Sequence, residues 1–86
     1  MYRLTYTPQA LKDAKKIGKS PFLSKTQQLL EIIQIDPYRT FPSCEKLLGD
    51  LAGAYSRRIN IQHRLIYQVD EAHKVIKVIR MWGHYE

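Results

Sequence analysis

The 86-residue sequence predicts one α+β domain in which a strand and two helices precede a four-stranded antiparallel meander, with both helices packed on one sheet. Three observations carry this prediction: an alternating strand pattern at the start, two helix-start signals after it, and short segments rich in β-branched and aromatic residues from about residue 45 onward. The length is sufficient for one hydrophobic core but not for two. The domain is therefore expected to span residues 1–86.

The N-terminal segment alternates apolar and polar side chains. Tyr2, Leu4 and Tyr6 are separated by Arg3 and Thr5, which is the period of two typical of a half-buried strand. The pattern predicts a strand over residues 2–6.

A first helix follows directly. Thr7 supplies a capping oxygen and Pro8 fits the first helical position, while Gly18 is placed to end the helix. An apolar stripe and a cationic face make this helix amphipathic. The stripe comprises Ala10, Leu11, Ala14 and Ile17, and the cationic face comprises Lys12, Lys15, Lys16 and Lys19.

A second helix is predicted by the same cap-then-proline signal at Ser20 and Pro21. It runs to Asp36, because Pro37 pushes the preceding residue out of the helical region. Its apolar stripe has helical spacing and comprises Phe22, Thr26, Leu29, Leu30 and Ile33.

The second half of the sequence predicts four strands, at residues 45–51, 55–60, 64–69 and 74–82. The connections between them are too short for parallel crossovers, so antiparallel hairpins are expected.

The composition excludes several classes of protein. Fourteen Lys and Arg against eight Asp and Glu give a formal charge of +6, which points to an anionic partner: nucleic acid, an acidic membrane surface or an acidic protein. Cys44 is the only cysteine, so an internal disulfide and a Cys-rich metal site are excluded. The sequence offers neither a signal peptide nor a membrane span, and a cytoplasmic location is expected.

The richest stretch for chemistry is 55–67, which holds three arginines and no acidic residue. Strand alternation places Arg58 on one face and Arg57 with Tyr55 on the other, while Arg64 lies in the adjacent strand. Arginine suits phosphate, and a tyrosine ring can stack on an unpaired base. The alternative is a solvated sheet face with snorkelling arginines.

Acid–base groups lie on either side of this stretch. Glu45 is a candidate base, although a lone glutamate at a strand edge is usually a solubility residue. His84 can titrate near neutral pH, but it lies in a terminal tail of a kind that often frays. His63 and His73 fall at turns and are expected to be surface residues. Together with Cys44 they lack the spacing of a zinc site, so no metal is predicted.

These residue types fit RNA cleavage by the 2′-hydroxyl of the RNA itself. The reaction needs a base, a cation beside the phosphate and an acid for the departing 5′-oxygen. Glu45, Arg64 or Arg58, and His84 have the required chemistry.

Three segments together resemble the YoeB (Txe) toxins of bacterial toxin–antitoxin modules. They are the run from Glu45 to Ile59, the run from His63 to Tyr67, and the terminal pair His84 and Tyr85. The resemblance covers the C-terminal half residue by residue, and the N-terminal half agrees in its strand-helix-helix order. Two departures are Leu48, where the family often has lysine, and Glu86 after the His-Tyr pair.

The resemblance implies a RelE/ParE-superfamily protein with a microbial-RNase-like fold that cuts mRNA in the ribosomal A site without a metal or other cofactor. It implies catalytic roles for Glu45, Arg64, His84 and Tyr85, with Arg58 at the substrate. Partners would be the ribosome, mRNA and a YefM-like acidic antitoxin.

Three further residues are predicted to contact the substrate: Arg57, Tyr55 and Lys46, the last as a substitute for the family lysine. A ParE-like toxin that inhibits DNA gyrase is the alternative function, and a basic RNA-binding module without catalysis is a third. The sequence leaves homodimerisation open.

Overall fold

A computed structural model of the chain describes residues 1–41, 43–48 and 53–83. It contains a five-stranded sheet of order β1-β5-β4-β3-β2 and two helices. The strands are β1 (Arg3–Tyr6), β2 (Glu45–Lys46), β3 (Ala54–Arg58), β4 (Arg64–Asp70) and β5 (Val75–Arg80), and the helices are α1 (Pro8–Gly18) and α2 (Leu23–Ile35).

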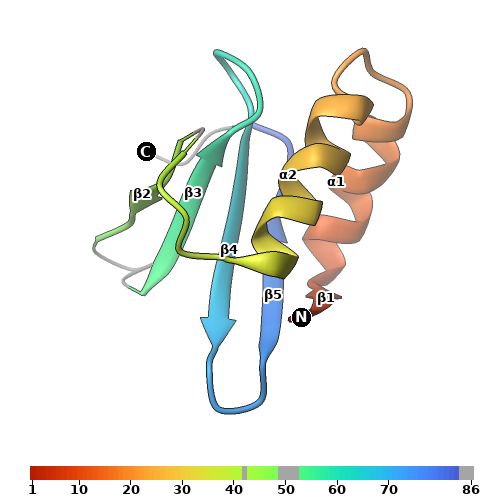
Figure 1. Cartoon of the computed structure of the whole chain (residues 1–86). Coiled ribbons are helices and arrows are strands. Elements are labelled where there is room, and N and C mark those ends of the chain that lie inside the picture. The colour runs from red at the N-terminus through yellow and green to blue at the C-terminus, as the bar shows by residue number, and fades with distance from the viewer. Residues whose placement is uncertain (42, 49–52, 84–86) are drawn as a thin grey trace.

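The sheet topology confirms the predicted α+β fold and its antiparallel meander. Strands β2, β3, β4 and β5 pair in sequence order, each antiparallel to the next. Strand β1 pairs parallel with β5, with Arg3 opposite Val75 and Tyr6 opposite Val78, which makes the sheet mixed. Both helices lie on the same side of the sheet (Figure 1).

The two predicted helix starts behave differently. Thr7 caps α1 as expected, because its hydroxyl oxygen accepts a hydrogen bond from the Ala10 amide at 3.1 Å. The Ser20 hydroxyl accepts instead from the nearby Phe22 amide at 3.1 Å. This bond closes a turn, and α2 begins only at Leu23. In the described part of the chain, neither helix has the length and apolar character needed to cross a membrane.

Two predicted strands are shorter in the structure by three residues or more. The strand predicted over 45–51 is seen as Glu45–Lys46, and residues 49–52 lie outside the described residues. Strand β5 ends at Arg80 and not at Trp82, because the amides of Met81 and Trp82 bond to a side chain, that of Asp13, and not to a neighbouring strand.

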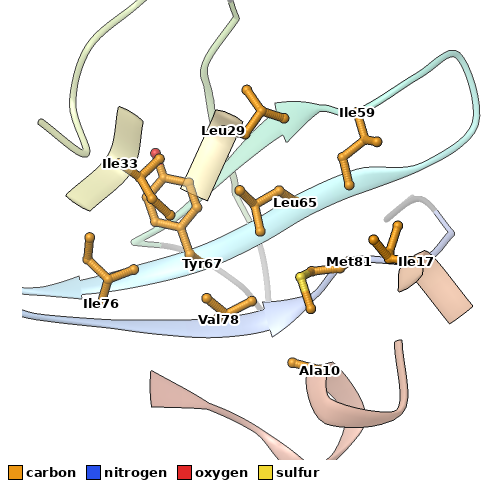
Figure 2. Close-up of a cluster of buried hydrophobic side chains, with 10 residues drawn as sticks. All are labelled: Ala10, Ile17, Leu29, Ile33, Ile59, Leu65, Tyr67, Ile76, Val78 and Met81. Atoms are coloured by element: carbon orange, nitrogen blue, oxygen red, sulfur yellow. The ribbon is translucent and has the colours of Figure 1, made fainter. Parts of the chain in front are cut away.

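The hydrophobic core lies between the sheet and the helices. Figure 2 shows side chains from both helices pointing toward those of β4 and β5. Leu11, predicted as part of the apolar stripe of α1, is 54% exposed. The described core residues are Ala10, Ile17, Leu29, Ile33, Ile59, Leu65, Tyr67, Ile76, Val78 and Met81.

A fully buried carboxylate joins α1 to the end of β5. Asp13 accepts hydrogen bonds from the Arg80 guanidinium at 3.1 Å, the Met81 amide at 3.0 Å, the Trp82 amide at 3.3 Å and the Gln9 side chain at 2.9 Å. Burial acts to raise the pKa of Asp13, but the bonds from Met81, Gln9 and Arg80 outweigh it, so this pKa lies below its ordinary value.

A buried guanidinium joins the sheet to the loop that precedes β2. Arg57 is fully buried and donates to the Tyr67 hydroxyl at 3.0 Å, the Ser43 carbonyl at 3.0 Å and the Pro37 carbonyl at 3.1 Å. Burial raises the pKa of Tyr67, and its neutral hydroxyl donates to the same Pro37 carbonyl at 2.6 Å. The prediction of a surface, substrate-binding Arg57 is therefore wrong in its placement.

Replacing this guanidinium should destabilise the fold. We expect Arg57→Leu to lower the free energy of unfolding by about 1–3 kcal/mol, because buried oxygens lose their donors. Chemical denaturation measures the change. Arg58→Leu at the adjacent exposed position is the matched control and should stay within about 0.5 kcal/mol of wild type. Equal losses in the two variants would contradict the structural role of Arg57.

The lowered pKa of Asp13 predicts an acid-sensitive contribution to stability. A carboxyl whose pKa is lower in the folded protein stabilises it above the unfolded pKa, and this stability is lost as pH falls through the folded value. The difference in unfolding free energy between wild type and Asp13→Asn should shrink below about pH 4. Asp70 and Glu71, whose pKa values are also lowered, are present in both proteins and cancel. A difference independent of pH would contradict this assignment.

Candidate active site

The sheet register gathers three of the predicted site residues on one face, away from the helices. Glu45 lies opposite Ser56 and Arg58 lies opposite Arg64. Directly opposed residues share a face, and so do alternate residues along one strand, which joins Ser56 to Arg58. We call the face that carries these residues the outer face. It is the face where strand alternation in the sequence placed Arg58.

Glu45 and Arg58 are exposed on the outer face, and Arg64 is half-buried there. Glu45 is a diagonal neighbour of Arg58, a relation that typically separates backbones by about 7–8 Å. A carboxylate and two guanidinium groups can therefore reach one ligand placed over the β2, β3 and β4 strands.

The pairing of Arg58 with Arg64 creates a concentrated positive charge. Like charges directly opposite in a sheet repel each other, and a bound anion relieves that repulsion. The Arg64 side chain is held against the β3–β4 turn, because its guanidinium donates to the Asn60 carbonyl at 2.9 Å. The arrangement favours a phosphate group as the ligand.

The end of the described chain reaches this same place. The Arg64 amide donates to the Gly83 carbonyl at 2.9 Å, and Gly83 turns the chain with a φ of +90° that glycine adopts readily. His84 and Tyr85, the predicted acid and its neighbour, follow Gly83 in the sequence and lie outside the described residues. Their point of attachment is hydrogen-bonded to the backbone of the predicted catalytic arginine.

The prediction of His63 as a surface residue is wrong. The imidazole is 4% exposed, stacks on the Trp82 ring with centroids 4.0 Å apart, and its Nδ1 accepts from the Gly83 amide at 2.7 Å. His73 is exposed as expected, and its ring nitrogen lies 2.8 Å from the Asp70 carboxylate in the β4–β5 turn.

Three other predicted substrate contacts lie on the face opposite to Glu45. Lys46 opposes Tyr55 in the register, and Tyr55 shares its face with the buried Arg57. Tyr55 is half-buried, with its ring stacked on that of Tyr67 at 5.7 Å. The structure therefore separates Lys46, Tyr55 and Arg57 from the outer-face residues.

The structure adds two residues whose buried contacts the sequence did not predict, Asp13 and His63. Asp13 occupies a position with helical spacing between buried Ala10 and Ile17, and a carboxylate inside an apolar stripe is a readable signal of a buried contact. Nothing in the local pattern distinguishes His63 from a turn residue.

Among residues 1–41, 43–48 and 53–83, no group of three or more His, Cys, Asp or Glu side chains is placed to hold a metal ion.

The arginine pair predicts anion binding in the isolated protein. Inorganic phosphate should raise the melting temperature more than sodium chloride of equal ionic strength, because a ligand of the folded state stabilises it. Arg58→Gln should reduce this extra rise. Lys12→Gln, which removes the same charge from exposed α1, should leave it unchanged. Equal effects of the two substitutions would mean that the rise in melting temperature depends only on the net charge of the protein and not on the arginine pair.

The sequence comparisons identify relatives that match most of the chain. A family profile described as "YoeB-like toxin of bacterial type II toxin-antitoxin system" matches residues 6–85. Toxin YoeB from Streptomyces coelicolor is 33% identical over 76 residues, which cover 86% of this chain and 90% of that protein.

Solved structures agree with this match. A YoeB/ParE toxin from Agrobacterium tumefaciens superposes with a TM-score of 0.89 at 28% identity, covering 96% of this chain and 99% of that one. YoeB of Staphylococcus aureus has been solved in complex with YefM, with a TM-score of 0.83, 35% identity and 99% of both chains covered. Its dimer structure has a TM-score of 0.83, 36% identity and 98% of both chains covered. The resemblance predicted from residues 45–85 is confirmed, and this chain belongs to the YoeB toxin family of bacterial type II toxin–antitoxin systems.

Proposed function

We propose that this protein is an endoribonuclease that cleaves mRNA in the ribosomal A site. The observation that carries the proposal is an exposed carboxylate and an arginine pair on one sheet face, with the backbone that leads to the His-Tyr tail hydrogen-bonded to the Arg64 amide. Membership in the YoeB family supports the same reaction.

The proposed chemistry begins with the ribose of the mRNA. The Glu45 carboxylate accepts the proton of the 2′-hydroxyl, whose oxygen attacks the adjacent phosphorus. A new bond forms between the 2′-oxygen and phosphorus as the bond from phosphorus to the 5′-oxygen breaks. His84 donates a proton to the departing 5′-oxygen, and Tyr85 orients the base or the phosphate. The products are a 2′,3′-cyclic phosphate and a 5′-hydroxyl.

Arg58 and Arg64 would bind the scissile phosphate. Paired, charge-assisted hydrogen bonds from guanidinium groups strengthen as negative charge accumulates on phosphorus oxygens in the transition state. This chemistry requires no metal.

The burial of Arg57 supports a smaller set of substrate contacts in this proposal. Arg57 and Tyr55 are assigned to the opposite face, where Arg57 holds the 37–43 loop that leads to Glu45. Lys46 stays a prediction as an RNA contact from the exposed sheet edge.

The ribosome is part of the proposed active complex. Few catalytic groups are present, so correct placement of the RNA must supply much of the rate enhancement, and a ribosome holding mRNA in the A site provides that placement. The proposed substrate also places the protein in the cytoplasm.

Primer extension on a translated mRNA with stalled ribosomes tests the proposal. Wild type should cut at A-site codons, and Glu45→Gln or His84→Ala should lower the cleavage rate by about 10² to 10⁴. Matched controls are Glu31→Gln on exposed α2 and His73→Ala in the exposed β4–β5 turn, which should cleave like wild type.

Intact mRNA with folded, ribosome-bound wild type would overturn the nuclease proposal. A gyrase supercoiling assay would then test the ParE-like alternative. RNA binding without a cleaved product would favour the third possibility, a non-catalytic RNA-binding module. Such binding would weaken steeply with salt, because phosphate contacts release counterions.

A YefM-like acidic antitoxin is the proposed inhibitor. The formal charge of +6 and the arginine pair favour an acidic segment that orders on binding. The Staphylococcus aureus relative is solved both with YefM and as a dimer, which supports the same two partners for this chain.

A further inference from the structure

We infer that Asp13, in helix α1, is a positioning residue for the nuclease site, because it fixes the chain segment from which the His-Tyr tail departs. This inference rests on the proposed function. Asp13 would not touch the RNA. It would act through residues 80–83, the last described residues before His84.

The Asp13 carboxylate takes the place of a neighbouring strand at the end of β5. One of its oxygens accepts from the Arg80 guanidinium, the Met81 amide and the Trp82 amide, while the other accepts from Gln9. The amides of residues that leave a sheet would otherwise be buried without partners. A single ionised side chain therefore satisfies two backbone groups and a guanidinium at once.

The remaining backbone groups of this segment are bonded to Arg80, His63 and Arg64. The Trp82 carbonyl accepts from Arg80 at 2.9 Å, the Gly83 amide donates to His63, and the Gly83 carbonyl accepts from the Arg64 amide. The Trp82 ring stacks on His63. Both backbone polar groups of Trp82 and of Gly83 are thus bonded to fixed partners.

The segment is consequently clamped between α1 and the β3–β4 turn. Asp13 supplies the contacts from α1, and His63 and Arg64 supply those from the turn. If the α1 side is released, the start of the tail keeps its contacts to the turn and the Arg80 bond to the Trp82 carbonyl but loses the Asp13 bonds to the Met81 and Trp82 amides. A displacement of about 1 Å in a catalytic group can cost about 10²-fold in rate, so the clamp matters for an acid carried on the tail.

The central variant is Asp13→Asn, which keeps the size of the side chain but removes its charge. Two readouts are needed: single-turnover cleavage on programmed ribosomes, and hydrogen exchange of the Trp82 and Gly83 amides in the isolated protein. Trp82 is the only tryptophan in the sequence, so its fluorescence gives a further signal from this segment.

We expect Asp13→Asn to bind ribosomes as wild type does but to cleave about 10- to 100-fold more slowly. The two amides should exchange faster, and Trp82 emission should shift to longer wavelength as the ring becomes more solvated. Ile33→Val is the stability control, because Ile33 is a buried α2 core residue far from residues 80–83 in the sequence. It should leave cleavage and the Trp82 signal unchanged.

A second variant covers the case in which Asp13→Asn does not fold. Arg80→Gln changes a half-exposed side chain that bonds both Asp13 and the Trp82 carbonyl, and it should slow cleavage in the same way. Where both variants fold, the double variant should slow cleavage by less than the product of the two single effects, since both act on one contact.

The results separate this inference from the proposed function. Unchanged exchange at Trp82 and Gly83 in Asp13→Asn would overturn the inference, and so would faster exchange with wild-type cleavage. If wild type itself cleaves no mRNA, the proposed function fails. The positioning of the segment by Asp13 would then be judged from the exchange data alone.

Discussion

The parallel pairing of β1 with β5 is the constraint on which the rest of the structure depends. It places β1 at one edge of the sheet, whereas β2 lies at the other. The chain between these two strands must therefore cross the whole sheet, and it does so as α1, α2 and the loop to β2 on one face (Figure 1). That crossing leaves the opposite face to carry Glu45, Arg58 and Arg64.

Two buried charges of opposite sign complete the arrangement. Arg57 joins the loop before Glu45 to the sheet by hydrogen bonds, and Asp13 joins the end of β5 to α1 in the same way. In each case one ionised group satisfies several oxygens or amides that the strands leave unpaired, which offsets the cost of burying the charge. Hydrogen bonds to these two ionised groups thus help to hold the segments that lead to the two proposed proton-transfer residues.

The sequence predicted the elements and the outer face of the site, because alternation, proline placement and short connections are local signals. It correctly placed Arg58 and Arg57 on opposite faces. It failed where the outcome depends on contacts between distant segments. The burial of Arg57 requires the Pro37 and Ser43 carbonyls, and the burial of His63 requires Trp82 and Gly83. The position of β1 at one edge of the sheet likewise depends on its pairing with β5, which no local sequence pattern predicts.

The β1–β5 pairing also has a consequence during protein synthesis. Thr7, just after β1, bonds through its hydroxyl to the carbonyl of Ile79, a residue 72 positions later in the chain. At the usual rate of about 5–20 residues per second, roughly 4–14 s pass between the synthesis of these two segments. During that interval the first strand has no partner, and the sheet face with its arginine pair is incomplete. A nascent chain of this fold therefore cannot complete its sheet until nearly the whole domain has been translated.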